Sequence, residues 1–485
     1  MKKYVLIAAI LCTVAGAGQT VTLSGQLPDN ADSVTVYVWD HFFNETRAMV
    51  TPYRSFSAPC QSGTFSIQLD SINNPVYFSL YSIKNSHKNP IPALRFYLAE
   101  PGDNIMLEIG SKKQVQVTGK GSAKYAFQYR SDTLTYYWDN RRPFDRSIYN
   151  DWKNKKYLDY LHKGFNLIDT FLARQIQLLE EYKTQLSEKV WLQLQADLLG
   201  KSIERKFQRF RSTEIDIKLK GSGNGEQSDL NRLCNLLTER VNNTHIPIPD
   251  AYLAKSKNYP IGIVQMTMAT QRQTDTGSVG KRFEENFKGV LRDKLWAVYL
   301  VDNFDHMPDA DSVLAVAIQA VKTPAYKAPL LTIQNRLTRG APSYNFMLED
   351  SNGRFRTLSE FKGKNVFLDF WFTGCSGCVM FYKKTLKSIE EVFSKDTSMV
   401  FISISVDTDK ETWLKSIADD NYTSTKAINL RTGTMGREHP VINWYAVSSY
   451  PKSILLDKNG NIYHNTTAVW DKEKLLSLLQ EVSRQ

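Results

Sequence analysis

Two cysteines in the last third of the chain, Cys375 and Cys378, are separated only by Ser376 and Gly377, and they open a stretch with helical spacing. Thiols at this spacing at a helix start can reach disulfide distance with little distortion of the backbone. The helix N-terminus also stabilises a thiolate through its unpaired N–H groups and its dipole. The pattern predicts thiol–disulfide exchange, in which the more exposed Cys375 attacks a partner's sulfur and Cys378 resolves the mixed disulfide.

The residues alone leave three other interpretations of this pair open. A zinc site would need a second pair of Cys or His ligands at similar spacing. His439 and His464 are isolated in the sequence. Cys60 and Cys234 lie far from the pair, so no bound metal is expected. A structural disulfide would close too short a loop to restrain the unfolded chain much, and two unrelated buried thiols are the third alternative.

Asp369 is the lone charge among seven otherwise apolar positions, 366–372, and it lies six residues before Cys375. An unpaired carboxylate in such a run is costly to bury, and its pKa should be raised. A carboxyl group that titrates near neutrality behind the cysteines can take up the proton that Cys378 loses when it attacks. The alternative is that Asp369 points to the end of its strand and pairs with a lysine or a backbone N–H.

The chain of 485 residues is long enough for about three domains at roughly 150 residues each. Strand-like alternation and turn residues occupy 19–122 and predict an all-β, sandwich-like module. Residues 123–336 have helical spacing and predict an α-helical region. Residues 337–485 alternate strands with helices and predict an α/β domain whose covered sheet contains parallel pairs. The apolar run at 365–372 is typical of the central strand of such a sheet.

The N-terminus predicts an exported protein. Paired lysines, an apolar run at 4–14 and small residues at 15–18 match the three parts of a signal peptide that spans residues 1–18. The apolar run is too short to span a bilayer, and no later stretch is long enough. The expected location is therefore the periplasm or the cell envelope.

The charge balance of the chain is basic, with 61 Lys and Arg against 50 Asp and Glu. This excess is spread along the chain, since residues 337–485 hold 19 basic and 17 acidic residues and no block rich in lysine and arginine occurs. Proteins that track a phosphate backbone concentrate such residues. Nucleic acid is therefore not an expected partner.

Residues 337–485 resemble the thioredoxin superfamily and, within it, the exported thiol–disulfide oxidoreductases of the TlpA and ResA type. The motifs that carry the likeness include Gly340-Ala341-Pro342, Leu368-Asp369-Phe370-Trp371, Cys375-Ser376-Gly377-Cys378 and Tyr450-Pro451. It implies a thioredoxin-like fold, disulfide exchange with cysteine-containing proteins of the cell envelope, and a membrane thiol carrier as electron partner. No bound cofactor is expected. The β-rich module resembles the domain that precedes thioredoxin-like modules in many exported bacterial proteins.

The resemblance also implies roles for two residues besides the cysteines. Pro451 would be cis, pack against the disulfide and help to bind the substrate backbone beside Cys375. Asp369 would be the buried acid and base. Two departures affect these roles, because Gly374 stands where a Trp commonly precedes the first cysteine and Phe381 stands where relatives often have Glu. Because that Glu is absent, Asp369 is the remaining candidate for the proton relay.

Two other functions remain as alternatives. The strand expected at 401–407 and the residues after it also look like those of a related family, the peroxiredoxin-type peroxidases. That family uses a Thr or Ser three residues before its reactive cysteine, and this chain has Phe372 there. The second alternative is a non-catalytic binding or sensing protein of the envelope with a degenerate thioredoxin-like module, against which the intact cysteine pair argues.

Overall fold

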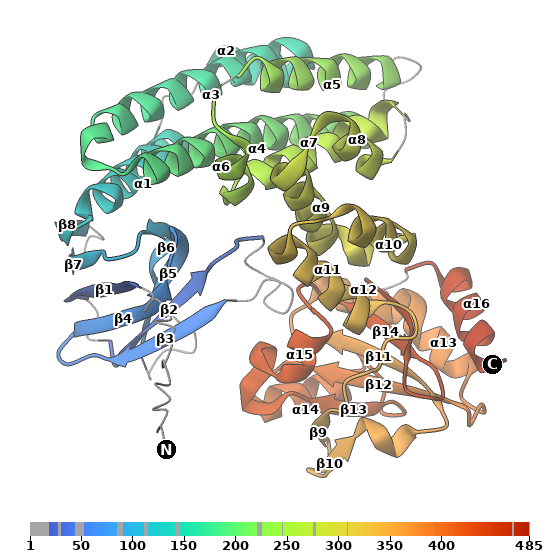
Figure 1. Cartoon of the computed structure of the whole chain (residues 1–485). Helices are drawn as coiled ribbons and strands as arrows, with labels where there is room; N and C mark the ends of the chain where they lie inside the picture. The colour runs from blue at the N-terminus through green and yellow to red at the C-terminus, as the bar shows by residue number, and fades with distance from the viewer. Residues whose placement is uncertain are drawn as a thin grey trace, which may run out of the picture. The chain divides into compact units, whose positions relative to one another are not determined.

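The structure of the protein is a computed structural model that describes residues 19–27, 31–43, 53–84, 91–110, 115–141, 146–220, 226–244, 246–274, 278–307, 309–467 and 470–484. The predicted signal peptide, residues 1–18, lies outside these residues. Strands come first in the described chain, helices follow, and a mixed α/β part ends it, which confirms the predicted fold class (Figure 1). Internal contacts divide the chain into two compact units. The first consists of Met1–His41, Tyr53–Asn150 and Asp169–Leu198, and the second consists of Phe42–Pro52, Asp151–Ile168 and Leu199–Gln485. The domain boundaries expected near 122 and 336 stay predictions.

The N-terminal part is built from strands, which are β1 (Gln19–Gln26), β2 (Ser33–Trp39), β3 (Arg54–Pro59), β4 (Thr64–Ile72), β5 (Val76–Ile83), β6 (Ile91–Ala99), β7 (Asn104–Ile109) and β8 (Val115–Lys120). In the described residues they form two four-stranded sheets, in the orders β4-β1-β7-β8 and β3-β2-β5-β6. Phe65, Ile67 and Leu69 on β4 are buried, whereas the residues between them are exposed. The buried faces of both sheets share one core, as in a β-sandwich.

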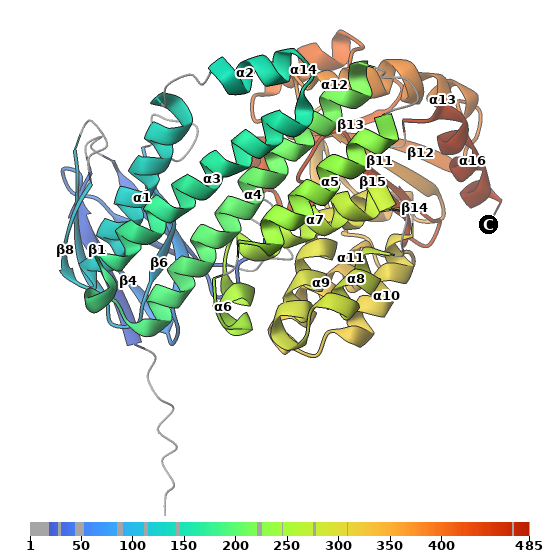
Figure 2. The same cartoon turned by 90° about the horizontal axis from the view of Figure 1, so that it is seen from above.

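The middle of the chain is helical, with α1 (Ser122–Arg141), α2 (Arg146–Lys153), α3 (Tyr157–Glu180), α4 (Glu188–Lys220), α5 (Glu226–Asn242), α6 (Asp250–Lys255), α7 (Tyr259–Thr274), α8 (Val279–Asn286), α9 (Gly289–Asn303), α10 (Ala310–Ala320) and α11 (Pro324–Leu337). Apolar residues recur every three or four positions here, and Leu161, Phe165, Leu179, Val190 and Leu194 are all buried. Figure 2 shows α5 and α7 side by side. No helix among the described residues is long and apolar enough to cross a membrane.

The end of the chain contains a sheet of seven strands, which are β9 (Met347–Asp350), β10 (Phe355–Thr357), β11 (Asn365–Trp371), β12 (Met399–Ser405), β13 (Ile428–Arg431), β14 (Lys452–Leu456) and β15 (Ile462–Thr467). Their order is β10-β9-β13-β12-β11-β14-β15. All residues of β11 are buried, and this strand pairs parallel with β12 and antiparallel with β14. The predicted covered central strand is therefore present.

Helices cover both faces of this sheet (Figure 1), and they are α12 (Ser376–Phe381), α13 (Lys387–Val392), α14 (Lys410–Ala418), α15 (Pro440–Trp444) and α16 (Lys472–Ser483). Val366, Leu368 and Phe370 on β11 pack in the core that includes α15. Phe367 packs in the other core, against α12, α13 and α16. Because side chains alternate along a strand, Asp369 lies on the same face as Phe367. The buried acid Asp369 is therefore on the face of the sheet that α12, α13 and α16 cover.

Candidate redox site

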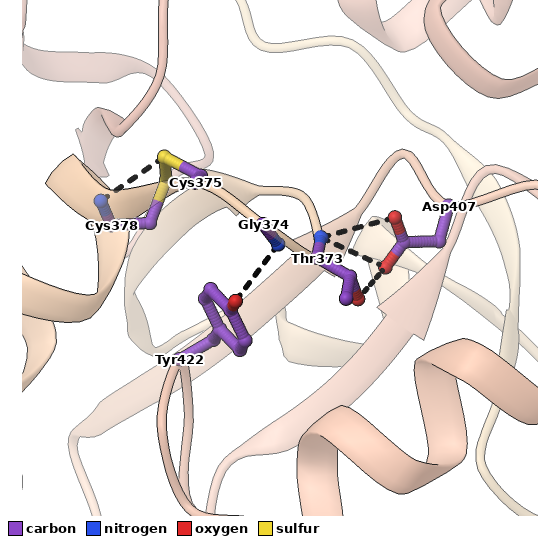
Figure 3. The surroundings of a disulfide bond; sticks show 6 residues. All are labelled: Thr373, Gly374, Cys375, Cys378, Asp407 and Tyr422. Carbon is purple, nitrogen blue, oxygen red and sulfur yellow. Dashed lines mark hydrogen bonds between the residues drawn. A yellow bond between two sulfur atoms is a disulfide. The ribbon is translucent and has the colours of Figure 1, made fainter.

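Cys375 and Cys378 are joined by a disulfide bond, with their Cα atoms 5.3 Å apart. Cys375 caps the first turn of α12, and its Sγ accepts a hydrogen bond from the backbone N–H of Cys378 at 3.1 Å (Figure 3). Cys375 is 7% exposed and Cys378 is 2% exposed, so Cys375 is the more accessible of the two, as expected. The bond excludes the interpretation of the pair as two unrelated thiols.

The turn that leads from β11 into the disulfide is held by two side chains from distant positions (Figure 3). The backbone N–H and the hydroxyl of Thr373 donate to the Asp407 carboxylate, at 3.1 and 2.7 Å. The N–H of Gly374 donates to the Tyr422 hydroxyl at 2.8 Å, and the Tyr422 ring stacks on Trp371 with centroids 4.8 Å apart. Gly374 has a φ of 96°, a left-handed conformation that favours glycine over the Trp common in relatives. Neither Asp407 nor Tyr422 is predicted as a site residue from the sequence.

The Tyr450–Pro451 peptide bond is cis, as the resemblance implies. A Cβ atom placed on Gly377 would lie 3.5 Å from Cδ of Pro451 and 3.7 Å from the carbonyl oxygen of Tyr450. The Pro451 loop therefore lies against the dipeptide between the cysteines. The Tyr450 ring also contacts Phe372 edge to face, with centroids 5.3 Å apart. The loop and the disulfide thus border one surface of the domain.

Asp369 lies in β11 and is only 4% exposed. Its Cα partners in the neighbouring strands are Ser403 and Ser453. The carboxyl group forms no hydrogen bond or ion pair with any described residue, and its Oδ1 atom is buried. Burial and the negative charge of Glu390 raise the pKa of Asp369 well above its usual value. The alternative in which Asp369 pairs with a lysine or a backbone N–H is therefore wrong.

A second acidic side chain, Glu390 on α13, lies near Asp369. Both line one small cavity, together with Phe367, Leu386, Phe401, Ile402, Ser403 and Thr423. Burial raises the pKa of Glu390 to about 7, although its carboxylate accepts a hydrogen bond from the Ser424 hydroxyl at 2.9 Å. Glu390 also borders an open pocket that Lys387 and Asp420 line. Glu390 therefore lies between the surroundings of Asp369 and the surface. The sequence does not predict it as a site residue.

Comparisons with known proteins bear on this part of the chain. A family model described as thioredoxin-like matches residues 363–462, which include the cysteines and the Pro451 loop. The thiol-disulfide oxidoreductase ResA of Bacillus thuringiensis is 26% identical over 171 residues, which are 35% of this chain and 93% of that protein. ResA of Bacillus subtilis is 27% identical over 150 residues, which are 31% of this chain and 78% of that protein. Both relatives match through most of their own length.

Solved structures show a similar coverage. The thioredoxin domain of a thiol-disulfide oxidoreductase from Bacteroides vulgatus is 27% identical and covers 30% of this chain and 97% of its own, with a TM-score of 0.26. A thiol:disulfide interchange protein from a Bacteroides species is 27% identical and covers 31% of this chain and 93% of its own, with a TM-score of 0.27. Scores this low add nothing to the assignment, which rests on the family model and the ResA relatives. On those grounds, the chain ends in a thioredoxin-like thiol–disulfide oxidoreductase domain with a close pair of cysteines, Cys375 and Cys378.

Proposed function

We propose that the protein is an exported enzyme that exchanges disulfides with cysteine-containing proteins of the cell envelope through Cys375 and Cys378. The observation that carries this proposal is the disulfide at the first turn of α12, which follows a buried strand that holds an unpaired acid, Asp369. A structural disulfide needs no such acid. A disulfide that opens and closes needs a group that takes up and returns a proton.

In the reduced protein, the Cys375 thiolate attacks one sulfur of a substrate disulfide. The substrate S–S bond breaks, its other sulfur leaves as a thiolate and takes a proton from solvent, and a mixed disulfide forms. Cys375 suits this step because it is the more exposed cysteine and because its Sγ accepts a hydrogen bond from the N–H of Cys378 at 3.1 Å. A hydrogen bond to sulfur at a helix start stabilises the thiolate.

The Cys378 thiol then gives its proton to the Asp369 carboxylate and attacks Sγ of Cys375. The mixed disulfide breaks, the substrate leaves with its second sulfur reduced, and the Cys375–Cys378 bond forms. Two electrons pass from the cysteine pair to the substrate, and the same steps in reverse oxidise a dithiol. Because burial raises the pKa of Asp369 towards that of a thiol, proton transfer between the two groups is easier than for an ordinary aspartate.

The partners follow from the same argument. An exchange enzyme in the envelope acts on folded or folding proteins with cysteines, and its own cysteines are reset by a membrane thiol carrier. The signal peptide pattern at 1–18 and the likeness to ResA support this assignment. The periplasm or cell envelope is accordingly the proposed location.

The test is reduction of insulin disulfides by the full chain, with dithiothreitol as the electron source. We expect turnover well above the rate without enzyme, and its complete loss in Cys375→Ser. The matched control is Cys234→Ser, because Cys234 is a free buried thiol whose pKa is raised to about 11 by burial. That variant should keep full turnover. An inactive full chain whose Cys375 is reduced and unreactive would favour the non-catalytic binding protein instead.

A further inference from the structure

A cationic side chain, Arg437, lies beside the proposed exchange site. It belongs to the short segment η5 (Gly433–Glu438), which follows β13, and it is exposed. Its guanidinium carbon lies 4.8 Å from the ring centroid of Phe372 and 5.4 Å from that of Tyr450. It forms no ion pair with an acidic side chain of the described residues. An ordered surface arginine without an acidic partner is available to bind an anion.

The two rings under Arg437 come from two segments that lie next to the disulfide. The carbonyl oxygen of Phe372 accepts a hydrogen bond from the N–H of Cys375 at 3.2 Å. Tyr450 precedes Pro451, which lies against the dipeptide between the cysteines. Both rings pack against the apolar cluster that contains the two cysteines. Arg437 thus contacts two rings that border the disulfide.

The backbone fixes the position of this arginine before any partner binds. A Cβ atom on Gly436 would lie 2.8 Å from Cγ2 of Thr408 and 3.3 Å from the carbonyl oxygen of Val406, so only glycine allows the segment to approach so closely. Gly436 also has a φ of 51°, which favours glycine. Contact with two rings restricts the arginine side chain further. A cation held in this way loses little conformational entropy when it binds.

We propose that Arg437 forms an anion subsite at the rim of the disulfide and selects substrate polypeptides that carry an acidic side chain close to the exchanging cysteine. This inference rests on the proposed function. The guanidinium N–H groups form no hydrogen bond with the described residues, and they can donate two parallel hydrogen bonds to a carboxylate.

The test uses the full chain in its reduced form and synthetic peptides that differ in one residue. Each peptide has a single cysteine in a disulfide with the same neutral thiol, and Glu, Gln or Lys stands beside the cysteine. We expect the Glu peptide to react about ten times more efficiently than the Lys peptide, mainly through a lower KM, a ratio that corresponds to about 1.4 kcal/mol. The reason is that Arg437 attracts the carboxylate of one peptide and repels the ammonium group of the other. High salt should reduce the difference.

Variants of Arg437 separate the subsite from the exchange chemistry. Arg437→Gln should make the three peptides react at the same rate. Arg437→Glu should reverse the preference. The matched control is Arg354→Gln, which removes the same charge from an exposed arginine in the hairpin between β9 and β10. This variant should keep the preference for the Glu peptide.

Three outcomes would contradict either the Arg437 subsite or the proposed exchange function. Equal rates for all peptides with the unmodified protein would overturn the subsite and leave the exchange function intact. An equal loss of preference in Arg354→Gln would also overturn it, because overall charge would then explain the selectivity. No reaction with any peptide would contradict the proposed function itself.

Discussion

Asp103 and Asp369 are two buried aspartates in different parts of the molecule, and each is 4% exposed. Asp103 precedes β7 in the N-terminal unit and has a full set of partners. Lys124 Nζ lies 2.5 Å from Oδ1 of Asp103. Its Oδ2 accepts hydrogen bonds from the Tyr125 hydroxyl at 3.1 Å and from the N–H of Glu100 at 2.8 Å. The Asp369 carboxyl has none of these.

Burial raises the pKa of both carboxyl groups, but only Asp103 has partners that oppose the effect. A buried acid with a lysine and hydroxyl partners anchors a fold. A buried acid without partners stabilises nothing by itself, so its retention in β11 needs a chemical reason. The comparison therefore separates a structural aspartate from one that carries a proton.

The largest predicted effect is on exchange. Asp369→Asn keeps the shape of the side chain but removes the proton acceptor for Cys378, so insulin reduction at neutral pH should slow by about 100-fold or more. Turnover with a saturating electron donor measures this effect. Asp103→Asn is the control and should keep the rate per folded molecule. A similar loss of turnover in both variants would contradict a proton-carrying role that is specific to Asp369.

The second prediction concerns folding. Lys124→Met leaves Asp103 as an uncompensated buried charge, and this should lower the free energy of unfolding by about 3–5 kcal/mol. Unfolding in urea, followed by tyrosine and tryptophan fluorescence, measures it. The folded fraction of Lys124→Met should exchange disulfides normally. An unfolding transition at the same urea concentration as in the unmodified protein would contradict the structural role of Asp103.

The third prediction is a pH dependence of stability that comes from the unpaired Asp369. The pKa of Asp369 in the folded protein lies above its value of about 3.9 in the unfolded chain. Its contribution to stability is therefore fully present below that value and is lost as the pH rises, by about 1.4 kcal/mol per pH unit until the folded pKa is reached. Asp369→Asn should be more stable than the unmodified protein at pH 8, with the gain shrinking towards pH 4. Asp103→Asn should be less stable than the unmodified protein at both pH values. Thermal unfolding at the two pH values measures the difference, and a loss of stability in Asp369→Asn at pH 8 would contradict the unpaired state of Asp369.

The smallest predicted effect is that of Glu390 on Asp369. The charge of Glu390 helps to raise the pKa of Asp369. Glu390→Gln should therefore move the pH profile of exchange to lower pH, by less than about one unit. Glu391→Gln, on an exposed position of the same helix, should leave the profile unchanged. Equal shifts in both variants would mean that Glu390 acts only through the overall charge of the helix.

The sequence predicts those parts of the site that depend on local order. Cys375 and Cys378 are neighbours in the chain, and Asp369 is conspicuous because its strand is apolar on both sides. The alternation in β4 and the helical spacing around Leu161 likewise predict their elements. Each of these patterns is contained in a few consecutive residues, so it can be recognised without knowing the tertiary contacts.

Other parts of the site depend on contacts between distant residues. Asp407 lies 34 residues after its partner Thr373, and Tyr422 lies 48 residues after its partner Gly374. Sequence spacing does not reveal contacts over such separations. Glu390 follows a π-helical turn at Tyr382–Leu386. Such a turn contains one more residue than an α-helical turn and rotates the residues after it, so regular α-helical spacing from Cys378 does not place Glu390 beside β11.

The most direct test of the central claim is to trap the first step of exchange. Full-length Cys378→Ser, reduced and freed of reductant, is mixed with a protein disulfide, and the adduct is located by mass spectrometry after digestion. The account predicts one mixed disulfide per chain, on Cys375. Adducts distributed over Cys60 and Cys234, or no adduct while Cys375 remains a free thiol, would contradict it.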